Sequence, residues 1–201
     1  MASIEIGRLL RASNTGFVFG CRVSQLDTPA LGSLVMVPVG GEYQIFAIVT
    51  DIYIDDDGLV RQLVTAEKVD EAILADNRIN RNVPLEISVL AIGYREGDIV
   101  RHLLPPRPPL SLDSIYLCNS AEVREFTGSG QFGYFRHILR SDQLPVEEIL
   151  AAHLLQAQAA HAEVGYGAWQ DRALAELITI LRDDYPRLMG VLGASSDALA
   201  R

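Results

Sequence analysis

The sequence contains a single lysine, Lys68, among its 201 residues. A nucleotide-binding P-loop needs a lysine directly after its last glycine, because that ammonium group reaches the terminal phosphates. Lys68 follows Glu67 instead, and the glycine-rich stretch 127–130 continues with Gln131 and Phe132. We therefore expect a turn between two elements at 127–130, and no ATP binding or hydrolysis by this chain alone.

Cysteines and long apolar runs are also scarce. Cys21 and Cys118 are the two cysteines, and both lie in apolar, strand-like surroundings. This favours buried free thiols over a disulfide, since a chain of this size needs no covalent staple. No stretch approaches 18 uninterrupted apolar residues, and residues 1–13 have no apolar signal core. We expect a cytoplasmic protein without a membrane span.

Basic residues are outnumbered, with 17 Lys and Arg against 26 Asp and Glu, for a net charge of −9. Binding to a phosphate backbone relies on clustered Lys and Arg. No basic run occurs, so nucleic acid is not an expected partner. Folding could still bring four arginines together: Arg61, Arg95, Arg101 and Arg107.

The first two thirds of the sequence have the pattern of β structure. Apolar or alternating runs rich in Val, Ile, Phe and Tyr are separated by Gly, Pro, Asn and Asp clusters. Their regular spacing predicts a sandwich or a small barrel, and a helix-like insertion interrupts them near 67–80. The runs are 4–10, 17–23, 34–39, 44–54, 83–95, 99–104 and 114–119.

The last third changes to a helical period. Pro145 with Glu147 and Glu148 is a good helix start, and a second helix is predicted from Ala168 to Tyr185. We expect a linker at 129–144 and a two-helix extension at 145–201. An apolar stripe on the second helix either covers the barrel or binds a protein partner or second subunit, and both remain open: Leu174, Leu177, Ile178 and Leu181.

Candidates for chemistry are few. His153 and His161 are eight residues apart, near Glu163, whereas metal ligands on a helix prefer a spacing of three or four. We expect both histidines to face solvent, and His102 and His137 to be structural. No catalytic, cofactor-binding or metal motif is found, and the sequence predicts a protein that is not an enzyme.

Two consecutive stretches carry a family resemblance: IGRLLRASNTGFVFGCRV (6–23) and LGSLVMVPVGGEYQIFAIVTDI (31–52). Together they resemble the opening of the HAS barrel, a domain shared by HerA-type DNA translocases and ATP synthase subunits. Residues 90–110 and 115–128 resemble the closing strands and short helix of translocase-type members. The resemblance covers about residues 3–128 and implies a closed barrel of about six strands over 1–128, with the insertion included.

In the translocase family the barrel forms ring contacts beside a motor domain that carries the P-loop. No motor follows the barrel within these 201 residues. The resemblance therefore implies a non-catalytic assembly or adaptor module for a larger complex, with a separate P-loop ATPase as one candidate member.

The alternative is a small-molecule or anion-binding protein, or a small enzyme, with a pocket between barrel and helices. Four arginines would then bind the anion: Arg8, Arg11, Arg22 and Arg136. In either case we expect Gly7, Gly20 and Gly32 to lie at or beside barrel strands. We also expect five apolar residues to be buried: Phe17, Val35, Val37, Ile48 and Ile52.

Overall fold

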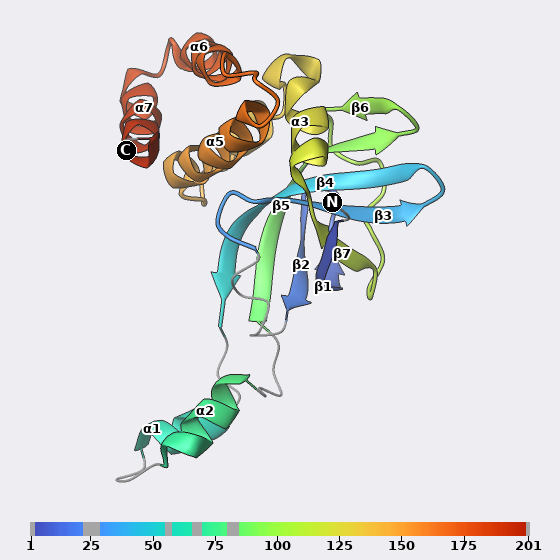
Figure 1. The fold of residues 1–201 in the computed structure, drawn as a ribbon, viewed down its shortest axis with the longest axis vertical. Coiled ribbons are helices and arrows are strands. Elements are labelled where there is room, and N and C mark those ends of the chain that lie inside the picture. Colours follow the sequence, from blue (N-terminus) through green and yellow to red (C-terminus); the bar gives the residue numbers. More distant parts are fainter. Residues whose placement is uncertain (1–2, 22–28, 55–57, 66–69, 80–84, 200–201) are drawn as a thin grey trace.

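The computed structural model describes residues 3–21, 29–54, 58–65, 70–79 and 85–199. Seven antiparallel strands form one sheet in the order β2-β1-β7-β3-β4-β5-β6, and an additional pairing of β2 with β5 closes six of them into a barrel (Figure 1). The short β6 extends the sheet beyond β5. The strands are β1 (Ile4–Ala12), β2 (Gly16–Cys21), β3 (Leu34–Gly40), β4 (Tyr43–Tyr53), β5 (Leu85–Glu96), β6 (Ile99–Arg101) and β7 (Ser114–Leu117).

Strands β3 and β4 are buried on both faces. Successive side chains of a strand point to opposite faces, and Ile45 and Val49 of β4 point into the barrel, whereas Phe46 and Ile48 pack outward against helices. This explains why the two segments read as continuous apolar runs rather than as alternating ones. The predicted barrel with a helical extension is confirmed.

Most of the expected core positions are buried. Phe17, Val35, Val37 and Ile48 are at most 3% exposed, and Ile52 is only partly buried. Gly7 and Gly20 lie in β1 and β2, and Gly32 lies two residues before the start of β3, as predicted.

Gly7 allows β1 and β2 to approach closely. A Cβ atom at this position would lie 2.2 Å from the carbonyl oxygen of Gly20 and 2.9 Å from the ring of Phe19. Because backbone must move to relieve this clash, we expect Gly7→Ala to lower the free energy of unfolding by about 1–3 kcal/mol. The measurement is urea denaturation. Gly167→Ala is the control, since a Cβ there meets nothing within 4 Å; equal midpoints for both variants would contradict the prediction.

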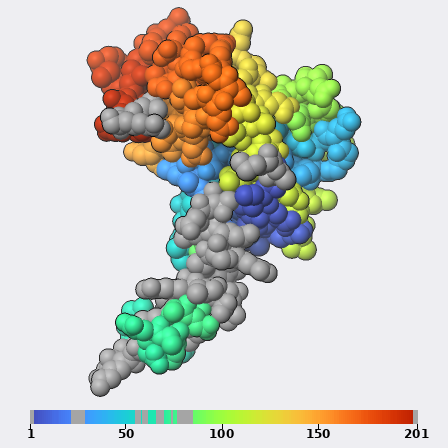
Figure 2. Space-filling model, viewed as in Figure 1, coloured from blue at the N-terminus to red at the C-terminus, as the bar shows by residue number. Residues whose placement is uncertain are grey.

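Helices occupy two separate places. Helices α1 and α2 form an insertion between β4 and β5 that projects below the barrel, whereas the remaining helices gather above it (Figure 1). In the space-filling view the latter form a continuous lobe on the barrel (Figure 2). The helices are α1 (Leu59–Thr65), α2 (Glu71–Ile79), α3 (Ser120–Gly128), the 3-10 helix η2 (Gly130–Phe132), α4 (Phe135–Leu139), α5 (Val146–Ala162), α6 (Trp169–Leu181) and α7 (Tyr185–Leu199).

Three parts of the chain contain more helices than the sequence predicts, although α2 lies within the helix expected near 67–80. The insertion contains two helices rather than one, and residues 66–69 between them lie outside the described part of the chain. The expected linker 129–144 contains η2 and α4, whose apolar side chains at 132, 135, 138 and 139 are buried between barrel and helices. The C-terminal extension has three helices rather than two. Pro186 was expected to end or kink the second helix, but it lies in the first turn of α7, where a missing backbone N–H costs no hydrogen bond.

No helix in the described ranges is long and apolar enough to span a membrane.

Candidate functional site

The interior of the barrel is a packed core. Side chains from all six closing strands fill it, among them Ile6, Phe19, Val37, Ile87 and Ile115, and each of these is fully buried. Cys21 also belongs to this core, and burial raises the pKa of its thiol. Candidate sites therefore lie at the barrel–helix junction and on the outer surface.

All four histidines of the chain lie where helices meet the barrel or one another. His153 is 1% exposed and His161 is 4% exposed, so the expectation that both face solvent is wrong. Helix α5 lies between the barrel, α3 and α7, and it therefore buries residues on more than one side (Figure 1). Burial lowers the pKa of all four imidazoles.

His153 connects α5 to the barrel. Its Nδ1 donates to the carbonyl oxygen of Gly32 at 3.1 Å, because a carbonyl can only accept, and Nε2 accordingly accepts from the hydroxyl of Tyr134 at 3.1 Å. Burial lowers the pKa of His153 to about 4. Gly32 has φ of 76°, and a Cβ there would lie 2.6 Å from the amide nitrogen of His153. Both ring nitrogens are engaged, which makes this histidine a structural one.

His161 connects α5 to α3 and α6. Its Nε2 donates to the hydroxyl of Thr127 at 2.9 Å, since that hydroxyl gives its own proton to the carbonyl of Val123 at 2.7 Å. The imidazole stacks on Trp169 with ring centroids 4.8 Å apart and planes 11° apart. Desolvation, with a smaller contribution from Arg124, lowers its pKa.

His102 and His137 form a second polar group around one carbonyl. The carbonyl of His102 accepts from the guanidinium of Arg136 and from Nε2 of His137, while Nε2 of His102 donates to the carbonyl of Phe126 at 3.1 Å. Nδ1 of His102 lacks a hydrogen bond of normal geometry and lies against Gly130, where a Cβ would approach it to 2.8 Å. These contacts fit the structural role that the sequence predicts for both residues.

The histidines do not form a metal centre. His153 contacts Gly32 and Tyr134, whereas His161 contacts Thr127 and Trp169, so the two rings have separate surroundings. Within the described ranges no group of three or more His, Cys, Asp or Glu side chains is placed to hold a metal ion.

A groove lies between the barrel, α3 and α5, in the place where the ligand-binding alternative puts a pocket. Its volume is about 440 Å³. We name it the junction groove. Burial raises the pKa of Cys118, one of its lining residues, well above the ordinary value, so this side chain stays a neutral thiol. The groove is lined by Ala30, Ser33, Leu34, Leu117, Cys118, Ser120, Val123, Gln156, Ala159, Ala160 and Glu163.

The polar groups around the junction groove already have partners. Ser33 donates to the side-chain oxygen of Gln156 at 3.0 Å, and the amide of Gln156 donates to the carbonyl of Leu31. The carboxylate of Glu163 accepts from Ser120 at 2.8 Å and from Arg124 at 3.1 Å. The available surface of the groove is therefore chiefly apolar.

Of the four arginines expected to bind an anion, the three that the structure describes have partners away from this groove. Arg8 pairs with Glu5 at 2.9 Å, and Arg11 pairs with Glu86 at 2.7 Å. Arg136 bonds to the carbonyl of His102, as described above, and Arg22 lies outside the described residues.

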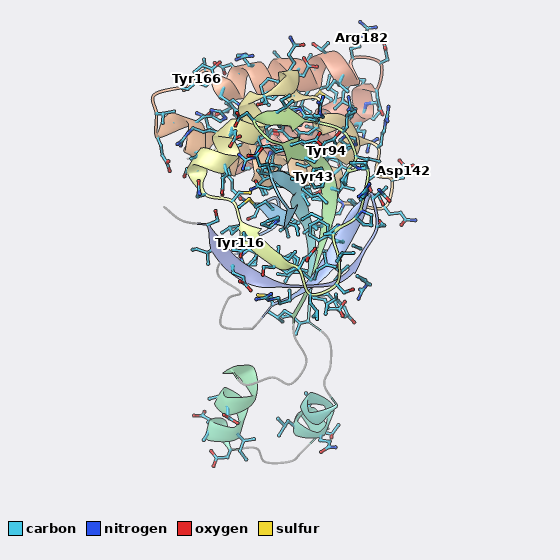
Figure 3. All side chains as sticks on the ribbon, turned by 90° about the vertical axis from the view of Figure 1, so that its right-hand side faces the viewer. Tyr43, Tyr94, Tyr116, Asp142, Tyr166 and Arg182 are labelled. Carbon is cyan, nitrogen blue, oxygen red and sulfur yellow. The ribbon has the colours of Figure 1, made fainter. Side chains whose placement is uncertain are left out.

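Of the four arginines considered for nucleic-acid binding, Arg95 is already paired with a carboxylate. Arg95 makes two bonds of 2.7 and 2.8 Å to the carboxylate of Glu125 and a third to Gln44. Nearby, Tyr43 and Tyr94 form an aromatic pair with centroids 5.4 Å apart (Figure 3), and burial, followed by charges including Glu96, raises the pKa of Tyr43 to about 12. Arg101 and Arg107 are exposed, and the side chain of Arg61 is outside the description.

The predicted stripe on α6 is divided by the fold. Leu177 is fully buried and Leu181 is 5% exposed, in the same cluster as Trp169, whereas Ile178 is 45% exposed. Leu174 packs against that cluster and is partly buried. Of the four residues, Ile178 is the one that offers a partner a large apolar surface.

Among the leucines whose side chains the structure describes, the most exposed lie instead on the connection from β6 to β7. Leu110 and Leu112 are each 70% exposed, and Leu103 and Leu104 on the same connection are 51% and 41% exposed. We call residues Leu110–Asp113 the leucine turn. The sequence signal was weak, since two leucines beside prolines and an aspartate are common in surface loops.

Hydrogen bonds fix the conformation of the leucine turn. The amide of Asp113 donates to the carbonyl of Leu110 at 3.1 Å, and the Asp113 carboxylate accepts from the Leu110 amide at 2.8 Å. Leu112 donates its amide to Leu9 at 2.8 Å, and its carbonyl accepts from the Arg8 guanidinium at 3.3 Å. These bonds keep Leu112 at φ of 72°, a left-handed conformation that a leucine rarely adopts.

No family model matches the sequence, and no curated protein matches it.

Proposed function

We propose that this protein is a non-catalytic HAS-type barrel that acts as an assembly or adaptor module in a larger complex, of which a separate P-loop ATPase is a candidate member. The motifs described for residues 3–128 support the HAS assignment. The packed barrel interior supports a role that uses the outer surface.

The leucine turn is the observation that carries this proposal. Removing an exposed leucine from water contributes about 1.5–3 kcal/mol, and apolar groups gathered on a surface mark protein interaction sites. Leu110 and Leu112 are 70% exposed, on a turn whose hydrogen bonds hold it in a strained conformation. A rigid apolar projection binds a partner with little loss of conformational entropy.

The alternative, a ligand-binding protein, would use the junction groove, whose volume of about 440 Å³ falls in the usual range for small-molecule pockets. Its one charged lining residue, Glu163, is already engaged by Ser120 and Arg124. The groove therefore suits an apolar group better than an anion.

The experiment is chemical cross-linking in the native cells, followed by purification of the tagged chain and quantification of the proteins bound to it. We expect the double variant Leu110→Asp, Leu112→Asp to lose its specific partners at least about tenfold, as for hot-spot residues. Aspartate tolerates the left-handed conformation at position 112, so the barrel should keep its fold.

Val164→Asp is the matched control, since Val164 is 60% exposed and lies outside the leucine turn. It should retain all partners. An identical set and quantity of partners for the double variant and the wild type would refute an adaptor role for this surface.

A further inference from the structure

We infer that helix α7 is a displaceable strap, which swings away from α5 as a unit while the barrel and the other helices of the lobe stay docked. In the closed form that the structure shows, α7 lies beside α5 at the edge of the lobe (Figure 1). Opening exposes an apolar face of α5 that α7 otherwise covers. This device is independent of the leucine turn and of the junction groove.

Polar bonds fasten the other helices of the lobe to their neighbours. Arg124 of α3 donates to the carbonyl of Ala160 on α5 at 2.8 Å. The indole of Trp169, the first residue of α6, donates to the carbonyl of Thr127 on α3 at 3.4 Å. Helices α4 and α5 each bond through one histidine to the segment that follows β6 or the one that precedes β3, as described above. In the part of the chain that the structure describes, no hydrogen bond or ion pair joins α7 to another helix or to the barrel.

Two buried polar atoms on the facing sides of α5 and α7 lack hydrogen-bond partners. Ser195 is 2% exposed on α7, and neither its hydroxyl nor the side-chain oxygen of Gln158 on α5 bonds to any described residue. Glu147 of α5 lies against Gly190 of α7, and Gln158 follows about three turns later on the same helix face. Docking takes such a group out of water without a hydrogen bond in return, and this weakens the contact.

The apolar contact of α7 is small, and its helix is intrinsically weak. Among the described side chains of α7, Val191 is the only apolar one that is fully buried, and Leu188 packs partly buried against the same cluster. Gly190 and Gly193 lie inside the helix, where glycine lowers helix stability relative to alanine. An element with few buried contacts opens before better-held elements do.

The connection from α6 to α7 provides the hinge. Residues 182–184 join the two helices. The side chains of Arg182 and Asp183 are 74% and 89% exposed, and Arg182 projects from the lobe (Figure 3). The carboxylate of Asp184 accepts from the amide of Arg187 at 3.2 Å, which caps the start of α7. Rotation about these residues therefore moves α7 as a helix, and no side chain of the connection has to leave a buried position.

Opening uncovers an apolar strip of α5. Ala151 and Leu154 lie on the same face of α5 as Glu147, because residues four and seven positions apart share one side of a helix. They are 5% and 0% exposed in the closed form. On the barrel side of α5, Ala157 lies one turn after His153 and is fully buried. The two sides of this helix therefore report separately on the release of α7 and on the loss of the barrel contact.

Hydrogen exchange of the full chain, measured by mass spectrometry, tests the strap. We expect protection factors in α7 to be at least about tenfold lower than in α5 and α6. Gly193→Ala should slow exchange of α7 about fivefold through its higher helix propensity, since a Cβ there meets nothing within 4 Å. Ser195→Ala should also slow it, and by more than Ser196→Ala, the matched control at the exposed neighbouring position. Exchange in the barrel should stay unchanged in all three variants.

Thiol labelling measures whether α5 is uncovered. Ala151→Cys places a thiol under α7, and Ala157→Cys places one on the barrel side of the same helix. The native thiols of Cys21 and Cys118 are buried, and peptide mapping separates them from the introduced ones. We expect Ala151→Cys to react at least about tenfold faster than Ala157→Cys. Adding Gly193→Ala should slow the reaction of Ala151→Cys about fivefold.

Equal protection of α7 and α6 would overturn the inference, and so would equal reaction rates of the two introduced thiols. Exchange of α7 that follows the barrel in mild denaturant would also contradict it, because α7 would then open only by global unfolding. The adaptor function stands or falls separately, since its variants change the leucine turn.

Discussion

The variant Leu177→Glu is expected to unfold the helical lobe at denaturant concentrations that leave the wild type intact, with a loss of about 4 kcal/mol or more in the free energy of unfolding. Leu177 is fully buried beside Trp169 and Ala173. The substitution removes a buried aliphatic side chain and places an unpaired carboxylate in an apolar cluster, and each change is strongly destabilising. Urea denaturation followed by circular dichroism measures the loss.

Ile178→Glu is the matched control, since Ile178 is the next residue of α6 and is 45% exposed. Its free energy of unfolding should change by less than about 1 kcal/mol. The molar mass of Leu177→Glu is measured alongside. If Leu177→Glu were fully stable but had an altered molar mass, Leu177 would instead contact a partner or a second subunit. The sequence left this possibility open.

Acid is expected to destabilise the protein through His153. Its pKa falls from 6.5 when unfolded to about 4 when folded, and a difference of one in pKa corresponds to about 1.4 kcal/mol. Well above pH 6.5 the imidazole is neutral in both states, and the full contribution of His153 to the free energy of unfolding is present. As the pH falls from 6.5 to 4 the unfolded state binds the proton first, and about 3 kcal/mol of stability is lost.

The variant His153→Gln isolates this contribution, because glutamine has an amide donor and acceptor but no titrating group. Its stability at pH 7 should be lower than that of the wild type, since the imidazole packs and bonds between Gly32 and Tyr134. Between pH 7 and pH 4 the difference between the two proteins should shrink by about 3 kcal/mol. Urea denaturation at several pH values provides the measurement, and parallel losses in both proteins would contradict the prediction.

The two predictions concern the same structural element. Leu177 belongs to the apolar cluster that also includes Leu34, Phe46 and Ile48 of the barrel, and His153 donates to the carbonyl of Gly32 beside β3. A change at either position should therefore affect how the helical lobe docks on the barrel more than the barrel itself.

Most of the barrel could be predicted because its signals are local. Runs such as 34–39 and 44–54 combine β-branched and aromatic residues with turn residues at both ends. The three-helix extension was harder to predict from the sequence. Helix α5 is apolar on most of its surface, so its sequence lacks the clear polar face that would have shown where His153 and His161 point.

The candidate surfaces were predicted least well. The leucine turn depends on bonds from Arg8 and Leu9, about a hundred residues before Leu112, and no periodicity within 99–114 indicates them. The junction groove likewise requires Leu117 and Ala159 to meet. The stripe on α6 was detected by its spacing, but spacing alone does not say whether an apolar face is covered from within the chain.

The sequence by itself determined the alternation of strands and helices and the core positions of the barrel, and it excluded a P-loop. These properties follow from side-chain period, turn chemistry and residue type, which act over a few neighbouring positions. Only the tertiary structure decided that His102, His153 and His161 are buried, that Leu177 faces inward and that Leu110 and Leu112 face outward. Burial is set by which segments pack together, and here the deciding contacts join residues as far apart as Gly32 and His153.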